Sequence, residues 1–381
     1  MYLFWLWLAL LPQMSDRDKL HMLRLAGNPE DLYHADRNAL LALSPAEKRW
    51  APLLNKSLDA AQKIQKQCDT LGIRVLPLNH SEYPSLLRVI PDPPLVLYCK
   101  GRLPDLSQVP LVGVVGTRNC SDYGIAVARD LGMGLGLHGA GVISGMAAGI
   151  DGAATEGSLQ AGAPTVGVLG CGLDIIYPKS NASLYARMEQ QGCLISEFPP
   201  GTPAAGRNFP KRNRIISGLS VTVAVVEAPE RSGALITARL ALEQGRDVFA
   251  VPGAMNNPLC SGSNQLLHDG ACTVTCPWDI LEGQTCRYPC LQEHPSKKPV
   301  QAPPSEPTEI QTSKEPRPRP LPRDLNPQEQ AVYGALEPKD VHINTVAART
   351  GLDTSAIMAA LTLLELKGHV TVRPGGWART I

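Results

Sequence analysis

Residues 111–124 read LVGVVGTRNCSDYG, in which a short apolar run ends in a glycine loop that leads into a helical window. A run this apolar is typical of a strand buried on both faces, as in a parallel sheet. Strands that alternate with helices predict a parallel, doubly wound α/β sheet, and we place this Rossmann-like domain at residues 73–282. The runs lie at Leu111–Val115, Gly141–Ser144, Thr165–Leu169, Cys193–Ser196, Val221–Val226, Asp247–Val251 and Cys272–Thr275.

The rest of the 381-residue chain predicts three further parts around this domain. Residues 1–72 predict a domain of short helices. Its first segment, Met1–Leu11, is very apolar but shorter than the roughly 20 residues that span a membrane, so we expect a buried helix rather than a signal or an anchor. Residues 283–325 are Pro-rich and predict an extended linker. Residues 326–381 predict two helices and a hairpin, which is a winged-helix arrangement.

Composition restricts the function. Lys and Arg number 36 and Asp and Glu 35, so the net charge of +1 excludes a globally basic nucleic-acid coat. The ten cysteines, without a secretion signal, predict reduced thiols and a cytoplasmic protein. The pairs Cys272/Cys276 and Cys286/Cys290 leave a zinc site open, although their spacings are unusual for zinc. We find no Walker lysine motif and expect no cofactor.

Three loops follow predicted strands and open predicted helices. They contain Gly116, Thr117 and Arg118 in the first, Gly145 in the second, and Ser232 and Gly233 in the third. Helix N-termini attract anions, and Arg118 adds a permanent charge suited to phosphate. Because loops after parallel strands meet at one edge of the sheet, we expect one anion site there. The alternative is that the glycines only make tight turns. We interpret Asp151 as a helix-start residue rather than a catalyst.

Residues 206–214, GRNFPKRNR, contain four cations and one aromatic ring without an acid. Cations bind the backbone phosphates of a nucleic acid and an aromatic ring stacks on a base, so the segment predicts binding of single-stranded nucleic acid. The alternative is that the segment is only a run of charges exposed to solvent. We expect Arg118 and Arg212 at the surface of one groove, unless Arg212 instead packs against the sheet. In this segment, the residues that we expect to contact the single-stranded nucleic acid are Arg207, Phe209, Lys211, Arg212, Asn213 and Arg214.

Taken together, the motifs closely resemble the DNA-processing protein A family (DprA/Smf) of bacterial natural transformation. The matching stretches cover nearly all of residues 95–282 in the family's order. They are Val115–Arg118, Ser144–Asp151, Gly170–Asp174 with Tyr177-Pro178, Ser196-Glu197, Phe209–Ile216, Val225–Ala228 with Ser232-Gly233, and Val251–Gly253.

The resemblance implies an extended Rossmann fold with a SAM-like helical domain before it and a winged-helix module after it. It also implies a homodimer that binds single-stranded DNA and loads a RecA-type recombinase onto incoming DNA. By the same resemblance, Arg118 and residues 207–214 carry the strand, Phe209 lies near a base, and Arg246 supplies a further cation. Thr117 stands where the family commonly has Ser, and the hydroxyl is kept.

Two other functions compete with this one. A Rossmann-like nucleotide-processing hydrolase would need a catalytic acid–Arg pair in a closed pocket. A regulator of double-stranded DNA would act through the winged helix, but Thr354–Leu366 contains no Lys or Arg, unlike most recognition helices. We therefore expect a non-catalytic protein with no membrane association, and a C-terminal module that contacts protein or stabilises the chain.

Overall fold

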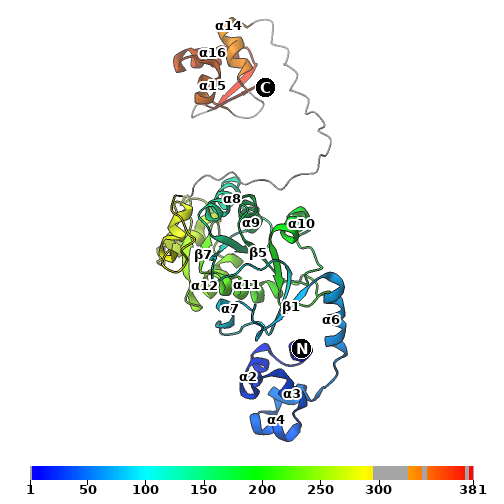
Figure 1. Ribbon diagram of the computed structural model, residues 1–381. Helices are drawn as coiled ribbons and strands as arrows, with labels where there is room; N and C mark the ends of the chain where they lie inside the picture. Colours follow the sequence, from blue (N-terminus) through cyan, green and yellow to red (C-terminus); the bar gives the residue numbers. More distant parts are fainter. Residues whose placement is uncertain (1, 295–324, 337–340, 374–376, 381) are drawn as a thin grey trace. The chain divides into compact units, whose positions relative to one another are not determined.

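The computed structural model describes residues 2–294, 325–336, 341–373 and 377–380 (Figure 1). Residues 1–301 and 302–381 form two compact units. None of the helices in these ranges is long and apolar enough to cross a membrane. The domain boundaries predicted at residues 72 and 282 stay predictions.

Within the described part of the first unit, nine strands form one sheet in the order β1-β2-β6-β5-β4-β3-β7-β8-β9. The seven strands from β6 to β9 are parallel, as the sequence predicts, whereas β1 and β2 extend the sheet with antiparallel pairing. The strands are β1 (Arg74–Pro77), β2 (Val96–Gly101), β3 (Leu111–Val115), β4 (Gly141–Ser144), β5 (Thr165–Leu169), β6 (Cys193–Ser196), β7 (Thr222–Val225), β8 (Asp247–Ala250) and β9 (Cys272–Thr273).

The sheet has a topological switch point at β3. From β3 the chain proceeds through β4, β5 and β6 to one side, and then returns to place β7 on the other side of β3. The loops after β3 and β7 therefore diverge and leave a crevice at the carboxyl edge of the sheet. Open α/β folds bind their ligands at this position.

Helices cover both faces of the sheet, which confirms the doubly wound arrangement (Figure 1). On one face, Val112 and Val114 of β3 pack against α8 and α9, and on the other, Leu111 and Val115 pack in the cluster that contains α11 and α12. The helices of this region are α7 (Ser85–Arg88), α8 (Asp122–Leu137), α9 (Ile150–Gln160), η2 (Lys179–Asn181), α10 (Ala182–Gln191), α11 (Asn208–Leu219), α12 (Gly233–Glu243), η3 (Pro258–Cys260), α13 (Ser261–His268), η4 (Pro277–Ile280) and η5 (Glu282–Gln284).

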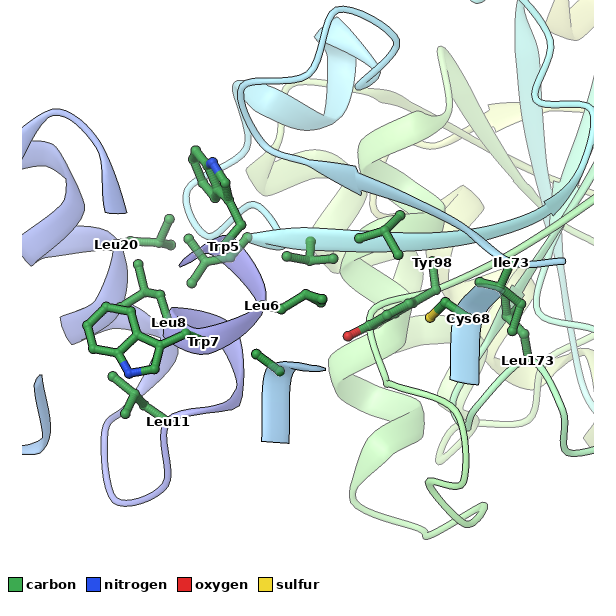
Figure 2. Packing of buried hydrophobic residues seen from close by; sticks show 14 of the residues in the cluster. Trp5, Leu6, Trp7, Leu8, Leu11, Leu20, Cys68, Ile73, Tyr98 and Leu173 are labelled. Atoms are coloured by element: carbon green, nitrogen blue, oxygen red, sulfur yellow. The ribbon is translucent and has the colours of Figure 1, made fainter. Parts of the chain in front are cut away.

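The N-terminal residues form short helices, and the predicted burial of the first one is confirmed. Trp5, Leu6, Trp7 and Leu8 are at most 6% exposed. Their cluster continues to Tyr98 of β2, so the first helix packs as core (Figure 2). These helices are α1 (Leu3–Leu10), α2 (Asp16–Ala26), α3 (Pro29–His34), α4 (Arg37–Leu43), α5 (Glu47–Trp50), η1 (Ala51–Leu54) and α6 (Asp59–Leu71).

The beginning of the predicted linker is part of the first unit. Tyr288 and Leu291 are 1% and 8% exposed and belong to the cluster under α8. The Tyr288 hydroxyl donates to the Leu106 carbonyl oxygen at 3.4 Å. The expectation of an extended segment is therefore wrong for these residues, because their apolar side chains have a core to join. Residues 295–324 of the predicted linker lie outside the described residues.

The second unit has the predicted winged-helix arrangement in its described ranges, together with a helix at Pro327–Gly334 that was not predicted. Three helices pack around Val332, Val346, Ile357, Leu361 and Leu364, beside a sheet of order β10-β12-β11. The first helix after residue 340 begins at Ile343, because Val341 and His342 pair with Ala378 and Trp377 in the small sheet. The elements are α14 (Pro327–Gly334), β10 (Val341–His342), α15 (Ile343–Thr350), α16 (Thr354–Leu366), β11 (Val370–Arg373) and β12 (Trp377–Thr380).

Candidate nucleic-acid interface

A cleft of about 330 Å³ opens at the switch point, where the loops after β3 and β7 diverge. Four separate segments line it: the β3–α8 loop, the start of α9, one face of α11 and the β7–α12 loop. The cleft therefore brings together most of the residues that the sequence singles out, namely Gly116, Thr117, Arg118, Phe209, Arg212, Asn213, Ser232 and Gly233. Gly145 lines an adjoining cavity of about 60 Å³ together with Arg118, Phe209 and Arg212.

The basic segment 207–214 begins a helix, α11, instead of forming a loop. The helical period separates its side chains onto two faces. Phe209, Arg212, Asn213 and Ile216 follow the i, i+3, i+4, i+7 spacing and line the cleft. Lys211 and Arg214 lie on another face and do not line the cleft.

The ring of Phe209 is the centre of a small cation–aromatic cluster. The Cζ atoms of Arg118 and Arg212 lie 5.1 Å and 5.9 Å from its centroid. The ring of Tyr177 lies 5.4 Å away, tilted by 31°, and Tyr177 is 41% exposed. A guanidinium group over an aromatic face is attracted electrostatically by the ring. Tyr177 is a site residue that the sequence argument missed, although its Tyr-Pro stretch is among the matching motifs.

Gly170 is needed where α11 approaches the sheet. A Cβ atom placed there would be 2.9 Å from Cδ1 of Phe209, closer than side chains normally approach. The missing side chain lets the ring lie against the end of β5. Asn208, which is also buried, donates from Nδ2 to the Gly170 carbonyl oxygen at 3.0 Å and anchors the start of α11 there.

Arg212 is buried, which corrects the expectation that its side chain lies at the surface. It is 4% exposed, and its Nη1 atom donates to the Val168 carbonyl oxygen at 2.9 Å. Its Nε atom is buried without a hydrogen-bond partner among the described residues. A Cβ atom on Gly145 would overlap Nη1 of Arg212, so this glycine makes the space that the guanidinium occupies.

Asp151 lies beside this guanidinium. It is 6% exposed in the first turn of α9, and its Oδ2 atom accepts from the Gly145 amide at 3.0 Å. Burial raises the pKa of Asp151, while the charge of Arg212 and backbone hydrogen bonds oppose that rise. The position in the first helical turn agrees with the prediction. Asp151 fixes the second glycine loop beneath Arg212.

Glu227, at the end of β7, holds the loop that carries Arg118. Its carboxylate is 1% exposed and accepts from the Ser121 amide at 2.9 Å and from the Ser121 hydroxyl at 2.6 Å. The Thr117 amide donates to the Glu227 carbonyl oxygen at 2.7 Å. Glu227 is a site residue that the sequence analysis did not single out, although an acid just after a strand that ends beside the switch point was an available signal.

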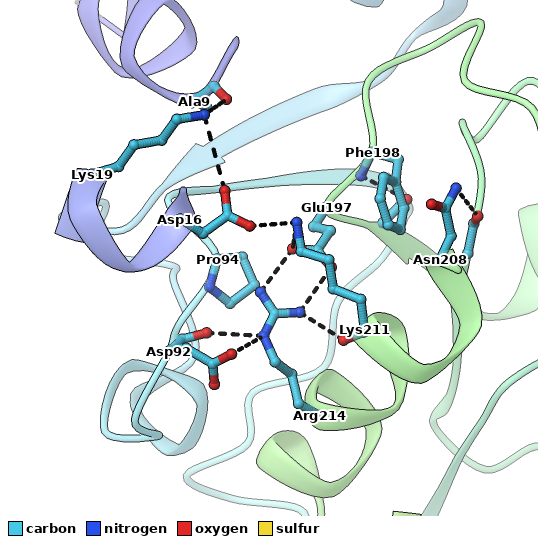
Figure 3. A network of polar contacts seen from close by, with 12 residues as sticks. Ala9, Asp16, Lys19, Asp92, Pro94, Glu197, Phe198, Asn208, Lys211 and Arg214 are labelled. Atoms are coloured by element: carbon cyan, nitrogen blue, oxygen red, sulfur yellow. Dashed lines mark hydrogen bonds and ion pairs between the residues drawn. The ribbon is translucent and has the colours of Figure 1, made fainter. Parts of the chain in front are cut away.

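Lys211 and Arg214 are engaged with acids on the far face of α11 (Figure 3). Arg214 donates to both carboxylate oxygens of Glu197 at 2.7 Å, and its Nε atom lies 3.0 Å from Oδ2 of Asp92. Lys211 pairs with Asp16 of α2 at 2.5 Å and lies 3.6 Å from Glu197. These two cations join α11 to the N-terminal helices and to the segment before β2, so the structure does not place them in the cleft with Arg212. That they contact DNA stays a prediction.

Two further predicted cations also lie outside the cleft. Arg207 is exposed at the N-cap of α11 and does not line it. Arg246 precedes β8, at the amino edge of the sheet, and donates to the carbonyl oxygens of Leu86 and Gly218 at 3.3 Å and 3.4 Å. The structure therefore places Arg246 at the edge opposite the cleft.

The cleft has a positive charge balance. Arg118, Arg212 and Arg231 line it, against the single carboxylate of Asp151. In the ranges that the structure describes, no three His, Cys, Asp or Glu side chains are grouped to hold a metal ion. All ten cysteines, each of which lies within those ranges, are free thiols. The arrangement suits an anion that also offers a flat apolar face.

Comparison with known proteins identifies two family domains. The family model described as DNA recombination-mediator protein A matches residues 74–285, and that of the DprA winged helix domain matches residues 315–376. Protein Smf from Synechocystis sp. is 37% identical over 97% of this chain and 96% of its own length. DNA processing protein DprA from Bacillus subtilis is 44% identical over 55% of this chain and 71% of its own length.

Solved structures agree with the fold. The X-ray structure of DNA processing protein A from Streptococcus pneumoniae matches with a TM-score of 0.65 and 32% identity, over 74% of this chain and 98% of that one. A structure reported for the single-stranded DNA binding mode of DNA processing protein A from Helicobacter pylori matches with a TM-score of 0.52 and 29% identity. That match covers 57% of this chain and 97% of the other.

Proposed function

This chain belongs to the DNA recombination-mediator protein A family, and from this we propose that it binds single-stranded DNA in the cleft at the switch point. A backbone phosphate lies between Arg118 and Arg212, and a neighbouring base stacks against Phe209. The Helicobacter pylori relative, whose single-stranded DNA binding mode has been solved, supports this choice of ligand.

The observation that carries the proposal is the buried guanidinium of Arg212. Removing a charge from water is costly unless it is paired and its hydrogen bonds are made. Among the described residues, Nη1 of Arg212 has the Val168 oxygen, but its buried Nε atom has no partner. A phosphate in the cleft supplies the missing acceptor and adds a negative charge to that of Asp151. Arg118, exposed across the Phe209 ring, gives the same phosphate a second cation.

Stacking favours a single strand over a duplex. A base can lie on Phe209 or Tyr177 only if its own face is free, and in a duplex both faces are covered by neighbouring bases. Cations and rings contact phosphates and base faces, which all nucleotides share, rather than the base edges that distinguish them. Binding is therefore preferential for single strands and largely independent of sequence.

The partners of this function follow from the family resemblance. We propose that the protein acts in the cytoplasm as a homodimer, protects incoming DNA during natural transformation and loads a RecA-type recombinase onto it. The free thiols of all ten cysteines support a reducing compartment. On α16 of the winged-helix unit, Met358, Leu363 and Leu366 are 41%, 43% and 80% exposed, which supports a role in protein contact.

A nucleotide-processing hydrolase is the rival, because Asp151 and Arg212 supply an acid and a cation in one cleft. Against it, the Asp151 carboxylate is 6% exposed and accepts from the Gly145 amide, so it serves the loop rather than a substrate. We therefore propose that the protein is not an enzyme. Incubation with nucleoside monophosphates decides between the two, because release of free base would establish the hydrolase.

Fluorescence anisotropy with a labelled oligo-dT tests the proposed function. Single-stranded DNA should bind more tightly than a duplex of equal length, and affinity should fall steeply with salt because phosphate contacts release counterions. Arg118→Ala should weaken binding about tenfold, the effect of one charge-assisted contact. Arg102→Ala is the matched control, since Arg102 is exposed at the amino edge of the sheet beside Cys193. Equal affinity for duplex and single strand, or binding indifferent to salt, contradicts the proposal.

A further inference from the structure

A groove of about 250 Å³ lies between α8, α9 and α10, on the helical layer next to the cleft. We call it the α9 groove, because the first turns of α9 form its floor. Gly152 has no side chain to fill this floor. A Cβ atom on Gly152 would lie 3.5 Å from the side-chain nitrogen Nδ2 of Asn181. Arg129 of α8 and Arg187 of α10 stand on the two sides, and Glu156 of α9 lies between them.

The charged groups of the α9 groove are only loosely paired. Arg129 Nη2 lies 3.6 Å from one oxygen of Glu156, and Arg187 Nη1 lies 3.5 Å from the other. Strong charge-assisted hydrogen bonds are about 2.7–2.9 Å long, so neither guanidinium is fully engaged. The Nε atom of Arg129 is buried and has no partner in the part of the chain that the structure describes. Two cations against one anion leave the groove positive.

The start of α10 adds to this positive field. Ser183 and Asn181 line the groove, and no side-chain hydrogen bond from the described residues caps this helix. The Asn181 side chain is instead held toward the loop before α9, because its Nδ2 atom donates to the carbonyl oxygens of Met146 and Ala147 at 3.1 Å and 3.0 Å. The partial positive charge of a helix N-terminus therefore faces the groove beside the two guanidinium groups.

The α9 groove adjoins the loop that carries Arg118. Gly149 lines the groove, and a Cβ there would lie 2.5 Å and 2.6 Å from the carbonyl oxygens of Thr117 and Arg118. Gly149 has a φ of +77°, a conformation that a side chain would strain, and it lies between Ala147 and Asp151, which line the cleft. Gly149 therefore brings the wall of the α9 groove against the loop that carries Arg118.

We propose that the α9 groove is a second phosphate subsite, which holds a backbone phosphate of the same DNA strand after it leaves the cleft. This inference rests on the proposed function of the cleft and extends it. Arg129 and Arg187 bind the phosphate from two sides, and the carboxylate of Glu156 competes with it. The subsite lengthens the bound segment without reading any base, because its groups reach only the backbone.

The test compares short and long strands, about 6 and about 20 nucleotides of labelled oligo-dT, in fluorescence anisotropy titrations over several salt concentrations. Arg129→Gln and Arg187→Gln should each weaken binding of the long strand about five- to tenfold and leave the short strand unchanged. The slope of log affinity against log salt for the long strand should fall by about 0.7 for each lost phosphate contact. Glu156→Gln should strengthen binding of the long strand, because the competing anion is gone.

Arg102→Gln is the control for loss of one positive charge, and melting curves establish that each variant folds. These three groove side chains are 35–43% exposed, so loss of their ion pairs should change stability little. An unchanged affinity of both arginine variants for the long strand, or an equal loss for both lengths, overturns the subsite. If Arg118→Ala weakens binding at both lengths in that case, the cleft stands and only the groove fails. An inert Arg118→Ala defeats the cleft itself.

Discussion

Arg212→Ala separates the structural role of this cation from its role in binding. The substitution removes the hydrogen bond to the Val168 oxygen and the charge that faces the buried Asp151 carboxylate. A hydrogen bond from a charged donor contributes roughly 1.5–3 kcal/mol, and removing one member of a buried charge pair costs roughly 3–5 kcal/mol. Because Asp151 keeps its backbone hydrogen bonds, we expect a loss of about 2–4 kcal/mol in the free energy of unfolding.

The melting temperature of Arg212→Ala should therefore fall by about 4–16 °C, at roughly 2–4 °C per kcal/mol for a unit of this size. Arg118→Ala and Arg207→Ala are the controls, because both side chains are exposed and their loss should leave the melting temperature unchanged. Anisotropy measured well below every melting temperature should show weaker binding for Arg212→Ala and Arg118→Ala. An Arg212→Ala protein that melts like the wild type refutes the buried role.

The pH dependence of the same variant has a defined sign. Burial raises the pKa of Asp151 in the folded protein, so its ionised form is penalised as pH rises above the unfolded value of about 4. Loss of Arg212 removes a positive charge that holds the pKa of Asp151 down, so the free-energy cost of ionising Asp151 in the folded protein grows. The stability difference between wild type and Arg212→Ala should consequently be largest near neutral pH and smaller near pH 5. Denaturant titrations at the two pH values measure it.

Three other outcomes are expected. Gly145→Ala should lower both binding and the melting temperature, because its Cβ would overlap Nη1 of Arg212, whereas Gly206→Ala, with open space around it, should do neither. Burial acts to raise the pKa of Asp279, but hydrogen bonds from Thr275 and Cys276 lower it to about 2. Asp279→Asn should therefore reduce the melting temperature at pH 7 and lose that effect as pH falls from about 4 toward 2. Deletion of residues 326–381 should leave most single-strand affinity intact, since the cleft lies in the first unit; near-complete loss in a folded truncation would place binding elsewhere.

The sheet was predictable because its strands are buried on both faces. Such strands read as continuous apolar runs, and every one of β3 to β6 consists entirely of buried residues. Pairing direction was harder to predict. Strands β1 and β2 add to the edge in antiparallel fashion, and their own sequences contain no signal that distinguishes this from a parallel crossover. The meeting of the loops at the carboxyl edge of the sheet followed from the parallel topology alone. The prediction that Arg118, Gly145 and Ser232 lie near one another at that edge is therefore confirmed.

The positions of individual side chains were less predictable, because a charge count does not name each charge's neighbour. The sequence analysis treated residues 207–214 as one basic segment with all its cations on one surface. In a helix, successive residues are rotated by about 100°, so these cations point in different directions. Arg212 enters the cleft with Phe209, while Arg214 meets Glu197, an acid 17 residues earlier in the chain. A search for a helical stripe would have grouped Phe209, Arg212, Asn213 and Ile216. The contacts of Arg214 depend on tertiary packing and left no local signal.

This division has a measurable consequence for salt dependence. If all cations of residues 207–214 contacted phosphates, replacing Lys211 would lower the slope of log affinity against log salt concentration as much as replacing Arg118. In the structure, the Lys211 ammonium already pairs with Asp16 and lies near Glu197, so it has little net charge to offer a phosphate. We expect Lys211→Gln to leave the slope unchanged and Arg118→Ala to lower it by about 0.7, the value for one phosphate on a single strand. Equal reductions in both variants would mean that α11 presents its far face to the DNA. The ion pairs of Figure 3 would then have to open on binding.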